Sequence, residues 1–244
     1  MMTNKLDIVI PVLNEEKTLY IQIEKLLFFL KDCHINYKII IADNGSKDDT
    51  RIEAQKLIHK YKNKITYLDV KIIGVGIALK TAWKKSSSQY LCFMDLDFST
   101  DLTHFHEAHK LLITNQYDCI YGSRLIKNSN VIGRKLIRTT ISRVYNLFLR
   151  LLFNINLSDA ACGFKFLSRN YFNHVNKFSV SNGWFYSSEL VIIGKFHRFK
   201  MYELPVVWRD DQSSKVKIFN LSLEYLKEMI LLRFNLIKQR KKYH

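Results

Sequence analysis

Proline and glycine are scarce in this 244-residue sequence, which holds two Pro and eight Gly. Such a composition excludes collagen-like, linker-like and low-complexity chains. No run of about 18 uncharged apolar residues occurs, so we expect no membrane-spanning helix, and the amino-terminal apolar stretch is too short for a signal peptide. Hydrophobic residues make up 48% of the chain and charged residues 25%, which is typical of a globular protein with a sizeable core.

Motifs of several enzyme classes and of disulfide-bonded proteins are also absent. The four cysteines form no CxxC pair and three lie in apolar segments, so buried, reduced thiols in a cytoplasmic protein are the simplest interpretation. The chain has neither a GxxxxGK[ST] phosphate-binding loop nor a GxSxG nucleophile motif. Neither a P-loop domain nor an α/β-hydrolase is therefore indicated.

Acidic residues are few in the second half of the chain. Residues 1–123 hold 16 basic and 15 acidic side chains, whereas residues 124–244 hold 22 basic and 7 acidic ones. Almost all of the formal net charge of +16 therefore comes from the second half. A bias of this size indicates an anionic partner, and the candidates are nucleic acid, anionic lipid and a phosphorylated substrate.

Apolar runs alternate with helical patterns in the first 123 residues. We expect strands over residues 6–13, 37–43, 65–70, 90–95 and 117–122, and helices over residues 17–33, 48–61, 77–85 and 101–115. Repeated strand–helix units predict an α/β fold with a mainly parallel central sheet that is covered by helices on both faces. Ligands bind such sheets beyond the carboxyl ends of the strands. That rule selects residues 11–15, 43–46, 95–97 and 122–124.

The second half is less regular and carries basic amphipathic segments. We expect strands over residues 162–167 and 201–208, and helices over residues 132–153, 187–196 and 219–242. Basic residues interleaved with Leu, Ile and Phe are common on ordinary packed helices, but they also suit an anionic membrane surface better than nucleic acid. Our hypothesis is that residues 131–156 and 219–242 attach a cytoplasmic protein peripherally to the cytoplasmic face of a membrane.

Two carboxylates at the end of the fourth expected strand give the sharpest chemical signal. On a strand, Asp95 and Asp97 would point to the same side. Adjacent anions repel unless a cation lies between them, and hard divalent cations prefer oxygen ligands. The alternative is a pair of solvated carboxylates. Two more strand ends carry weaker signals: Asp43 precedes an Asn-Gly turn, and Arg124 could direct its guanidinium into the same crevice.

Eight stretches occur in the order that the family 2 glycosyltransferases have them. They run from about Asp7 to Phe219 and comprise residues 8–19, 42–50, 74–83, 94–101, 122–124, 159–169, 184–190 and 206–219. The chain resembles the polyprenyl-phosphate branch of this family, which includes dolichyl-phosphate glucosyltransferases and mannosyltransferases. The form DxxCGFK at residues 159–165 looks more like the glucosyl members.

This resemblance implies a nucleotide-diphospho-sugar transferase fold (GT-A, Rossmann-like) and an inverting, metal-dependent reaction. A hexose, with glucose favoured, would pass from a UDP-glucose or GDP-mannose type donor to a polyprenyl (dolichyl or undecaprenyl) phosphate. Residues 1–218 would form the catalytic domain, with a nucleotide-sugar half at 1–123 and an acceptor half at 124–218, followed by a basic amphipathic helix at 219–244.

The resemblance also implies roles for individual residues. Asp95 and Asp97 would hold Mg²⁺ or Mn²⁺ on the diphosphate. The nucleotide sugar would contact Pro11, Leu13, Asn14, Glu15, Asp43, Asp95, Gly76 and Lys80. The acceptor phosphate would be bound by Arg124, helped by Arg134 or Arg138. The acceptor side would be lined by Asp159, Trp184, Glu189 and Lys215. Asp97, Asp159 and Arg124 would be the catalytic residues.

Four positions depart from the family pattern. Val75 replaces a frequent Lys, Asn44 the second Asp of DDGS, Ser187 an Asp of FDxEL, and Ser213 a Gly of GSK. Because Asp95, Asp97 and Arg124 are kept, we expect an active enzyme, in which the donor or the acceptor could differ from that of the relatives.

The reaction itself makes modest demands on these residues. A phosphate acceptor is already ionised and needs no strong general base, so positioning and charge control would be the enzyme's main work. A hydroxyl acceptor, on a glycan or a lipid-oligosaccharide, would need a base, for which Asp159 is the candidate.

Two non-enzymatic functions compete with transfer. The departures at Val75 and Ser187 would suit a non-catalytic membrane partner subunit, and the net charge alone would suit a nucleic-acid binder. The sequence is compatible with a homo-oligomer or with a complex with a membrane partner subunit. We expect no nucleic-acid partner, since no recognised nucleic-acid-binding motif occurs.

Overall fold

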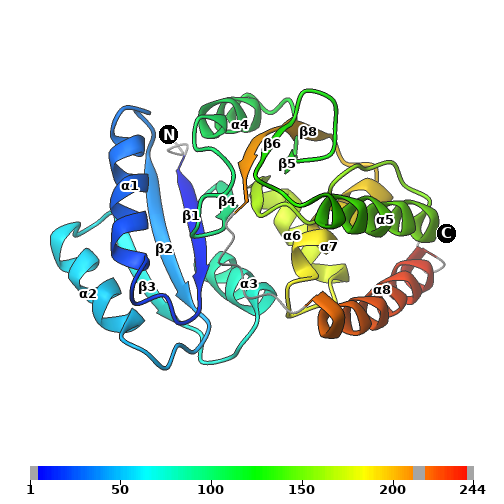
Figure 1. The fold of residues 1–244 in the computed structure, drawn as a ribbon. Coiled ribbons are helices and arrows are strands. Elements are labelled where there is room, and N and C mark those ends of the chain that lie inside the picture. The colour runs from blue at the N-terminus through cyan, green and yellow to red at the C-terminus, as the bar shows by residue number, and fades with distance from the viewer. Residues whose placement is uncertain (1–4, 211–217, 241–244) are drawn as a thin grey trace.

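A seven-stranded sheet organises the protein (Figure 1), and the computed structural model describes residues 5–210 and 218–240. The strand order is β3-β2-β1-β4-β7-β5-β8. The strands are β1 (Leu6–Val12), β2 (Tyr37–Asp43), β3 (Ile65–Asp69), β4 (Tyr90–Met94), β5 (Cys119–Ser123), β7 (Phe164–Ser168) and β8 (Met201–Pro205). All neighbours pair in parallel except β7, which is antiparallel to both β4 and β5. A small second sheet joins β6 (Asn130–Ile132) to β9 (Val207–Arg209).

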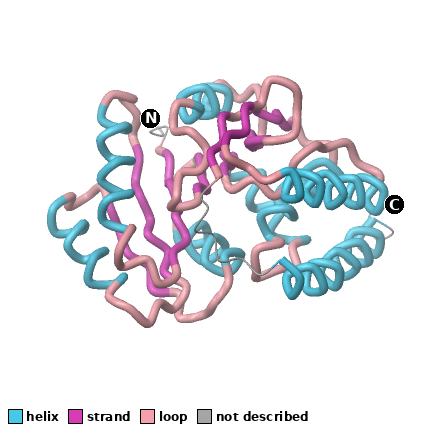
Figure 2. The backbone as a smooth tube through the Cα atoms, in the orientation of Figure 1, coloured by secondary structure: helices cyan, strands magenta, loops and turns pink. Residues whose placement is uncertain are grey.

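Helices cover both faces of the sheet (Figure 2). The helices are α1 (Leu19–Lys31), α2 (Thr50–Lys60), α3 (Val75–Lys85), α4 (His104–Ile113), α5 (Leu136–Phe153), α6 (Arg169–Phe178), α7 (Tyr186–Phe196) and α8 (Ile218–Arg240). One buried apolar cluster joins the sheet to α1, α2 and α4, and a second joins it to α3, α5, α6, α7 and α8. The expected α/β fold with a mainly parallel sheet is therefore confirmed.

Burial explains why the first half was easy to predict. Every residue of β4 and β5 is buried, so an uninterrupted apolar run marks each strand. The side chains that α1 buries, Leu19, Ile23, Leu26, Leu27 and Leu30, follow the helical repeat. Cys92, Cys119 and Cys162 are buried, and all four cysteines are free thiols, as expected.

The second half differs from expectation at three places. Residues 201–208 form two strands in two sheets, because the chain leaves β8 at Pro205 and pairs with β6 from Val207. The helix expected from residue 132 begins at Leu136, since β6 and a positive-φ Gly133 precede it. Helix α6 was not predicted at all.

The carboxyl-terminal helix belongs to the same folded unit as the rest. Met229, Leu232 and Leu236 are buried in the cluster that contains α3 and α7, and the Asn235 side chain donates to the Phe178 carbonyl at 2.7 Å. The expected boundary at residue 218 thus marks the start of a helix that is packed on the preceding part of the chain. Within residues 5–210 and 218–240, no helix combines the length and the apolarity needed to span a bilayer.

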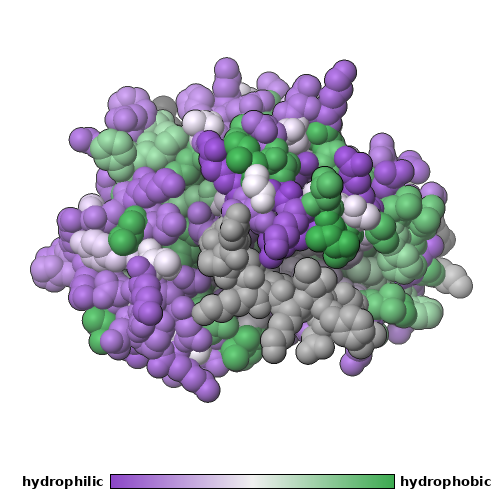
Figure 3. All heavy atoms as spheres, viewed as in Figure 1, coloured by the Kyte–Doolittle hydropathy of each residue, from purple (hydrophilic) through white to green (hydrophobic). Residues whose placement is uncertain are grey.

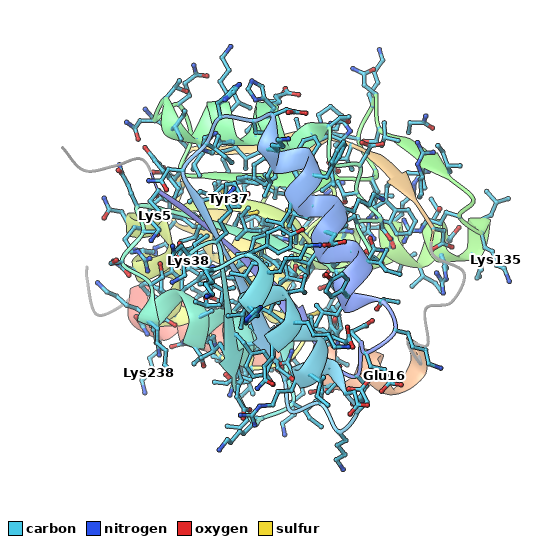
Figure 4. The ribbon with its side chains drawn as sticks, turned by 90° about the vertical axis from the view of Figure 1, so that its left-hand side faces the viewer. Lys5, Glu16, Tyr37, Lys38, Lys135 and Lys238 are labelled. Atoms are coloured by element: carbon cyan, nitrogen blue, oxygen red, sulfur yellow. The ribbon has the colours of Figure 1, made fainter. Side chains whose placement is uncertain are left out.

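The carboxyl ends of the parallel strands meet at one edge of the molecule. Figure 4 shows Lys5 and Lys38, at the amino ends of β1 and β2, on one side of the molecule. Glu16, which follows β1, and Lys135, which precedes α5, lie on the other side. The candidate functional residues lie on this second side.

Candidate active site

Asp95 and Asp97 lie in a tight turn directly after β4, which ends at Met94. The Asp95 amide donates to the Gly163 carbonyl at 3.1 Å, and the Phe98 amide donates back to the Asp95 carbonyl at 3.3 Å. Phe98 takes a left-handed backbone with φ of 46°. As expected, the two carboxylates line one small pocket. They are brought together by a turn, and not by the alternation of side chains along a strand.

Gly163, immediately before β7, leaves room for the Asp95 carboxylate. A Cβ at this position would lie 1.7 Å from Asp95 Oδ2 and 2.6 Å from Oδ1. Any side chain there would displace the carboxylate. The glycine of the CGFK stretch is therefore explained by this close approach.

The electrostatics of the pair suit a divalent cation. Burial, and next the negative charge of Asp97, raise the pKa of Asp95 to about 7, while Lys165 and Arg124 oppose the shift. The Asp97 carboxylate is exposed and accepts hydrogen bonds from the Ser99 amide at 2.9 Å and hydroxyl at 2.8 Å. Neither acid has an ion-pair partner among the described residues. Two oxygen-rich, uncompensated anions fit the preferences of Mg²⁺ or Mn²⁺.

No cluster of three or more metal-binding side chains exists within the described ranges. A cation held by Asp95 and Asp97 would need its remaining ligands from water or from the oxygens of a bound molecule. Mg²⁺ sites on substrate phosphates have this composition.

Arg124 and Asp159 form a bidentate ion pair next to the acidic turn. Arg124 Nε lies 2.6 Å from Asp159 Oδ2, Nη2 lies 2.9 Å from Oδ1, and the Arg124 amide donates to Oδ2 at 3.1 Å. Burial alone would raise the pKa of Asp159, but the charge and hydrogen bonds of Arg124 outweigh it, so the pKa lies below its ordinary value. A carboxylate with a lowered pKa is a poor proton acceptor, which weighs against Asp159 as a general base.

Trp208 connects two of the predicted arginines. The guanidinium carbons of Arg124 and Arg134 lie 5.5 and 5.3 Å from the centre of the Trp208 ring. Arg138 is paired with Asp210 at 2.8 Å. Arg134 donates to the Ser142 hydroxyl at 2.7 Å, whereas its buried Nε and Nη1 have no hydrogen-bond partner among residues 5–210 and 218–240. Burial and the nearby Arg124 lower the pKa of Arg134 to about 10, so it is still charged at neutral pH.

Among these three arginines, Arg134 therefore has donors left for a ligand. Buried polar atoms without a partner are uncommon and costly. An anion bound against Trp208 would satisfy them and would lie beside the acidic turn, because Thr100 forms a β-bridge with Trp208.

A cavity of about 350 Å³ opens beside the loop that follows β1. Four of the predicted ligand-binding residues line it, namely Pro11, Leu13, Glu15 and Trp184. The opposite wall comes from Glu224 and Tyr225 of α8, which sequence reasoning had not assigned to the site. Apolar side chains such as Val12, Ile73 and Val75 and the acidic residues Glu15 and Glu224 also line this cavity, which we call the slot.

Asp43 and Asn14 do not line this cavity, but they fix the loops whose neighbouring residues do. Asp43 Oδ1 accepts from the Gly45 and Ser46 amides at 3.0 and 2.8 Å, and Oδ2 accepts from the Tyr67 hydroxyl at 2.7 Å. Asn14 Oδ1 accepts from the Lys47 amide at 2.8 Å. Asp43 thus fixes the turn after β2 and connects it to β3, whereas Asn14 holds this turn against the loop after β1. Asn44, the departure from DDGS, lines the cavity itself.

Gly76, Lys80 and Glu189 hold the loop that carries Trp184. The Gly76 amide donates to the Gly183 carbonyl at 3.0 Å, and Lys80 Nζ donates to the Ser181 carbonyl at 2.6 Å. Glu189 accepts from the Val180 and Ser181 amides at 3.0 and 3.1 Å, and burial raises its pKa to about 7. In this structure these three residues contact the loop, and their predicted contact with a ligand stays a prediction. Lys215 and Ser213 lie outside the described residues.

Sequence reasoning missed Lys165 as well. This lysine is fully buried in β7, donates to the Cys162 carbonyl and to the Ser187 hydroxyl at 2.8 Å, and favours the ionised form of Asp95. A charged residue within the apolar run CGFKFL was the available signal. Ser187, where the family pattern has Asp, is its hydrogen-bond partner.

The comparisons with known proteins agree with this geometry. The sequence profile of glycosyl transferase family 2 matches residues 7–175. Over 244 residues the chain is 27% identical to the dolichyl-phosphate beta-glucosyltransferase of Homo sapiens, with 95% of this chain and 75% of that protein covered. Over 218 residues it is 29% identical to glycosyltransferase AglD of Haloferax volcanii, with 88% of this chain covered but 34% of that protein, so it spans about a third of that relative.

A solved structure confirms the predicted GT-A fold. Glucosyl-3-phosphoglycerate synthase from Mycobacterium tuberculosis, in a complex with Mn²⁺, uridine diphosphate and glucosyl-3-phosphoglycerate, superposes with a TM-score of 0.67 at 18% identity. The match covers 95% of this chain and 80% of that one. At this identity the likeness concerns the fold.

Proposed function

The chain belongs to glycosyl transferase family 2 and is a glycosyltransferase, and on this basis we propose that it transfers glucose from UDP-glucose to a polyprenyl phosphate at a membrane surface. One observation carries the proposal. The acidic turn at Asp95 and Asp97 lies beside an arginine cluster in which two donors of Arg134 have no partner in the part of the chain that the structure describes. Two anionic ligands can therefore be bound side by side, each with compensating charge.

The donor would lie between the slot and the acidic turn. Pro11, Leu13 and Tyr225 offer apolar surface to a base, and the carboxylates of Asp95 and Asp97 lie where a diphosphate could share a cation. The mycobacterial synthase was crystallised with Mn²⁺ and a uridine nucleotide, which supports this class of donor. When bound, the cation would supply Lewis-acid stabilisation of the departing diphosphate.

The acceptor phosphate would bind at Arg134, beside Trp208. Its oxygen is already ionised and can attack the anomeric carbon without a base, which agrees with Asp159 being fixed by Arg124 at a lowered pKa. Attack by the acceptor itself requires no covalent intermediate with the protein, so one displacement, with inversion, is the expected course. Four relatives named as dolichyl-phosphate beta-glucosyltransferases support the acceptor class.

The membrane contact would be made by α5 and α8. Leu136 is 85% exposed, Leu151 74% and Phe234 68%, and α5 contains Arg138, Arg143 and Arg150 but no acidic residue. Both helices lie at the same end of the molecule, where apolar side chains gather (Figure 3). Exposed apolar residues among basic ones suit an anionic bilayer, to which each Lys or Arg adds on the order of 1 kcal/mol.

A panel of donors tests the function. UDP-glucose, GDP-mannose and UDP-galactose would each be incubated with a short polyprenyl phosphate in detergent, with Mn²⁺ or EDTA. We expect glucosyl transfer from UDP-glucose that needs the cation, and a product of inverted configuration by NMR. Transfer only to sugar hydroxyls would identify a glycan or lipid-oligosaccharide as the acceptor. If the protein neither transferred the sugar nor hydrolysed any of the donors, an enzymatic role would be contradicted.

A further inference from the structure

A second cavity lies away from the active site, between the carboxyl-terminal ends of α5, α6 and α7 and the carboxyl-terminal half of α8. It has a volume of about 790 Å³. None of the residues assigned above to the donor, the cation or the acceptor lines it. It is therefore a separate feature, and the transfer reaction does not account for it.

The charge of this cavity has one sign. Lys177, Lys195, Arg198 and Arg233 line it, and none of its described lining residues is Asp or Glu. None of the four forms an ion pair within the described ranges. Four uncompensated cationic groups around one cavity favour an anionic ligand.

Two histidines on the cavity wall add unused hydrogen-bonding capacity. The centres of the His174 and His197 rings lie 4.6 Å apart, and the Nε2 atom of each is buried without a partner among the described residues. Burial lowers the pKa of both rings, that of His197 to about 4, so they are neutral at pH 7 and can each donate or accept a hydrogen bond.

Helix ends explain only part of this cluster. Lys177 and Lys195 lie in the last turns of α6 and α7, where a cation also stabilises the helix dipole. Arg198 directly follows the cap of α7 and can contribute in the same way, whereas Arg233 lies inside α8 and cannot. A cluster that extends to a second helix in this way favours an anionic ligand.

The helices that contribute to the cavity also carry exposed apolar side chains. Leu151 lies in the last turn of α5, and Phe234 and Ile237 lie on α8, close in sequence to Arg233; all three are exposed, although none of them lines the cavity. A ligand with a phosphate group and an apolar body would contact both kinds of surface. Free phosphate would contact only the basic one.

We propose that this cavity binds the phosphate headgroup of an anionic phospholipid, with its acyl chains directed along the exposed apolar residues of α5 and α8. The lipid is a molecule distinct from the polyprenyl phosphate acceptor. The proposal rests on the proposed docking of these two helices at a membrane, but it does not rest on the transfer reaction.

Calorimetric titration of the full chain with short-chain lipids below their micelle concentration tests this assignment. The ligands are dihexanoyl-phosphatidic acid, dihexanoyl-phosphatidylcholine and inorganic phosphate. We expect saturable binding of phosphatidic acid at one site, at least tenfold weaker binding of inorganic phosphate, and none of phosphatidylcholine. Equal affinity for inorganic phosphate would overturn the lipid assignment, and so would equal affinity for phosphatidylcholine.

A matched pair of variants locates the site. The double substitution Lys177→Gln and Arg233→Gln should weaken phosphatidic acid binding at least tenfold. The control, Arg51→Gln with Lys110→Gln, removes the same charge from exposed positions on α2 and α4 and should bind as the parent does. Thermal unfolding checks that each variant is folded, and Arg233→Lys should keep most of the affinity.

Equal binding by the two double variants would contradict the proposal. Glucosyl transfer in detergent to a short acceptor is measured separately. Failure of that reaction is therefore distinguishable from failure of lipid binding.

Discussion

The guanidinium of Arg124 meets the fully buried carboxylate of Asp159 through two hydrogen bonds, of 2.6 and 2.9 Å. Removing one partner would leave the other charge buried without compensation. We expect Asp159→Asn to lower the free energy of unfolding by about 3–5 kcal/mol in urea denaturation. Glu53→Gln, which removes a surface ion pair on α2, should leave it unchanged. A stable but inactive Asp159→Asn enzyme would instead indicate a general base.

Asp97 tests the proposed cation site. Its side chain is exposed and hydrogen-bonded only to Ser99 among the described residues, so Asp97→Asn should not alter the thermal unfolding temperature. We expect it to weaken Mn²⁺ binding, measured by electron paramagnetic resonance, at least tenfold, and to reduce transfer on the order of a hundredfold. Asp101→Asn, at the nearby carboxylate that faces Arg209, is the control and should keep Mn²⁺ affinity.

Gly163 offers a steric test of the same site. Gly163→Ala would place a Cβ against the Asp95 carboxylate, 1.7 Å from Oδ2. We expect a loss of about 1–3 kcal/mol of stability, together with weaker Mn²⁺ binding, because the carboxylate must move. Gly183→Ala, whose Cβ would meet no atom closer than 3.6 Å, should be tolerated. Unchanged Mn²⁺ binding by Gly163→Ala would argue against Asp95 as a ligand.

His197 predicts how stability depends on pH. Burial and the adjacent His174 lower its pKa from 6.5 to about 4. As the pH falls below 6.5, His197 becomes protonated in the unfolded chain before it does so in the folded chain, which favours unfolding. The contribution of neutral His197 to the free energy of unfolding is therefore complete above pH 6.5 and is lost as the pH falls toward 4. The slope attributable to one histidine is at most about 1.4 kcal/mol per pH unit. His197→Phe should flatten the decline seen by urea unfolding between pH 7 and 5, whereas exposed His59→Gln should not.

Vesicle sedimentation tests the proposed docking surface. Leu136→Ser with Leu151→Ser removes two exposed apolar side chains from α5 and should weaken binding to anionic vesicles about tenfold, without altering thermal stability. Ile21→Ser with Phe28→Ser makes the same kind of change on exposed positions of α1 and should have no effect. Equal binding by the two variants would place the membrane contact elsewhere.

Local signals in the sequence were sufficient for the parallel part of the sheet. Buried strands such as β2, predicted at residues 37–43, need only an apolar run and a following turn. The position of β7 between β4 and β5 was not predictable, because strand order depends on pairing across more than 40 residues of intervening chain. Helix α6 has a polar and basic sequence, and its buried face of Tyr171, Phe172, Val175 and Phe178 was not recognised.

In the candidate site too, local features were predictable from the sequence and contacts between distant residues were not. The acidic pair was found because two carboxylates end an apolar run, although the turn that brings them together was not anticipated. Pairings such as that of Arg124 with Asp159, 35 positions apart, depend on the folded topology. So do the contacts of Lys80 and Glu189 with the loop that carries Trp184.

Tyr225 lines the slot beside the loop after β1, although more than 200 positions of chain separate it from Pro11. A ribosome adds residues from the amino terminus, so the side of this slot that contains Pro11 is synthesised more than 200 residues before the side that contains Tyr225. A nascent chain shorter than 225 residues lacks that second side. Nucleotide binding in the slot should therefore require that α8 has been synthesised and packed, and it would report on the docking of this helix.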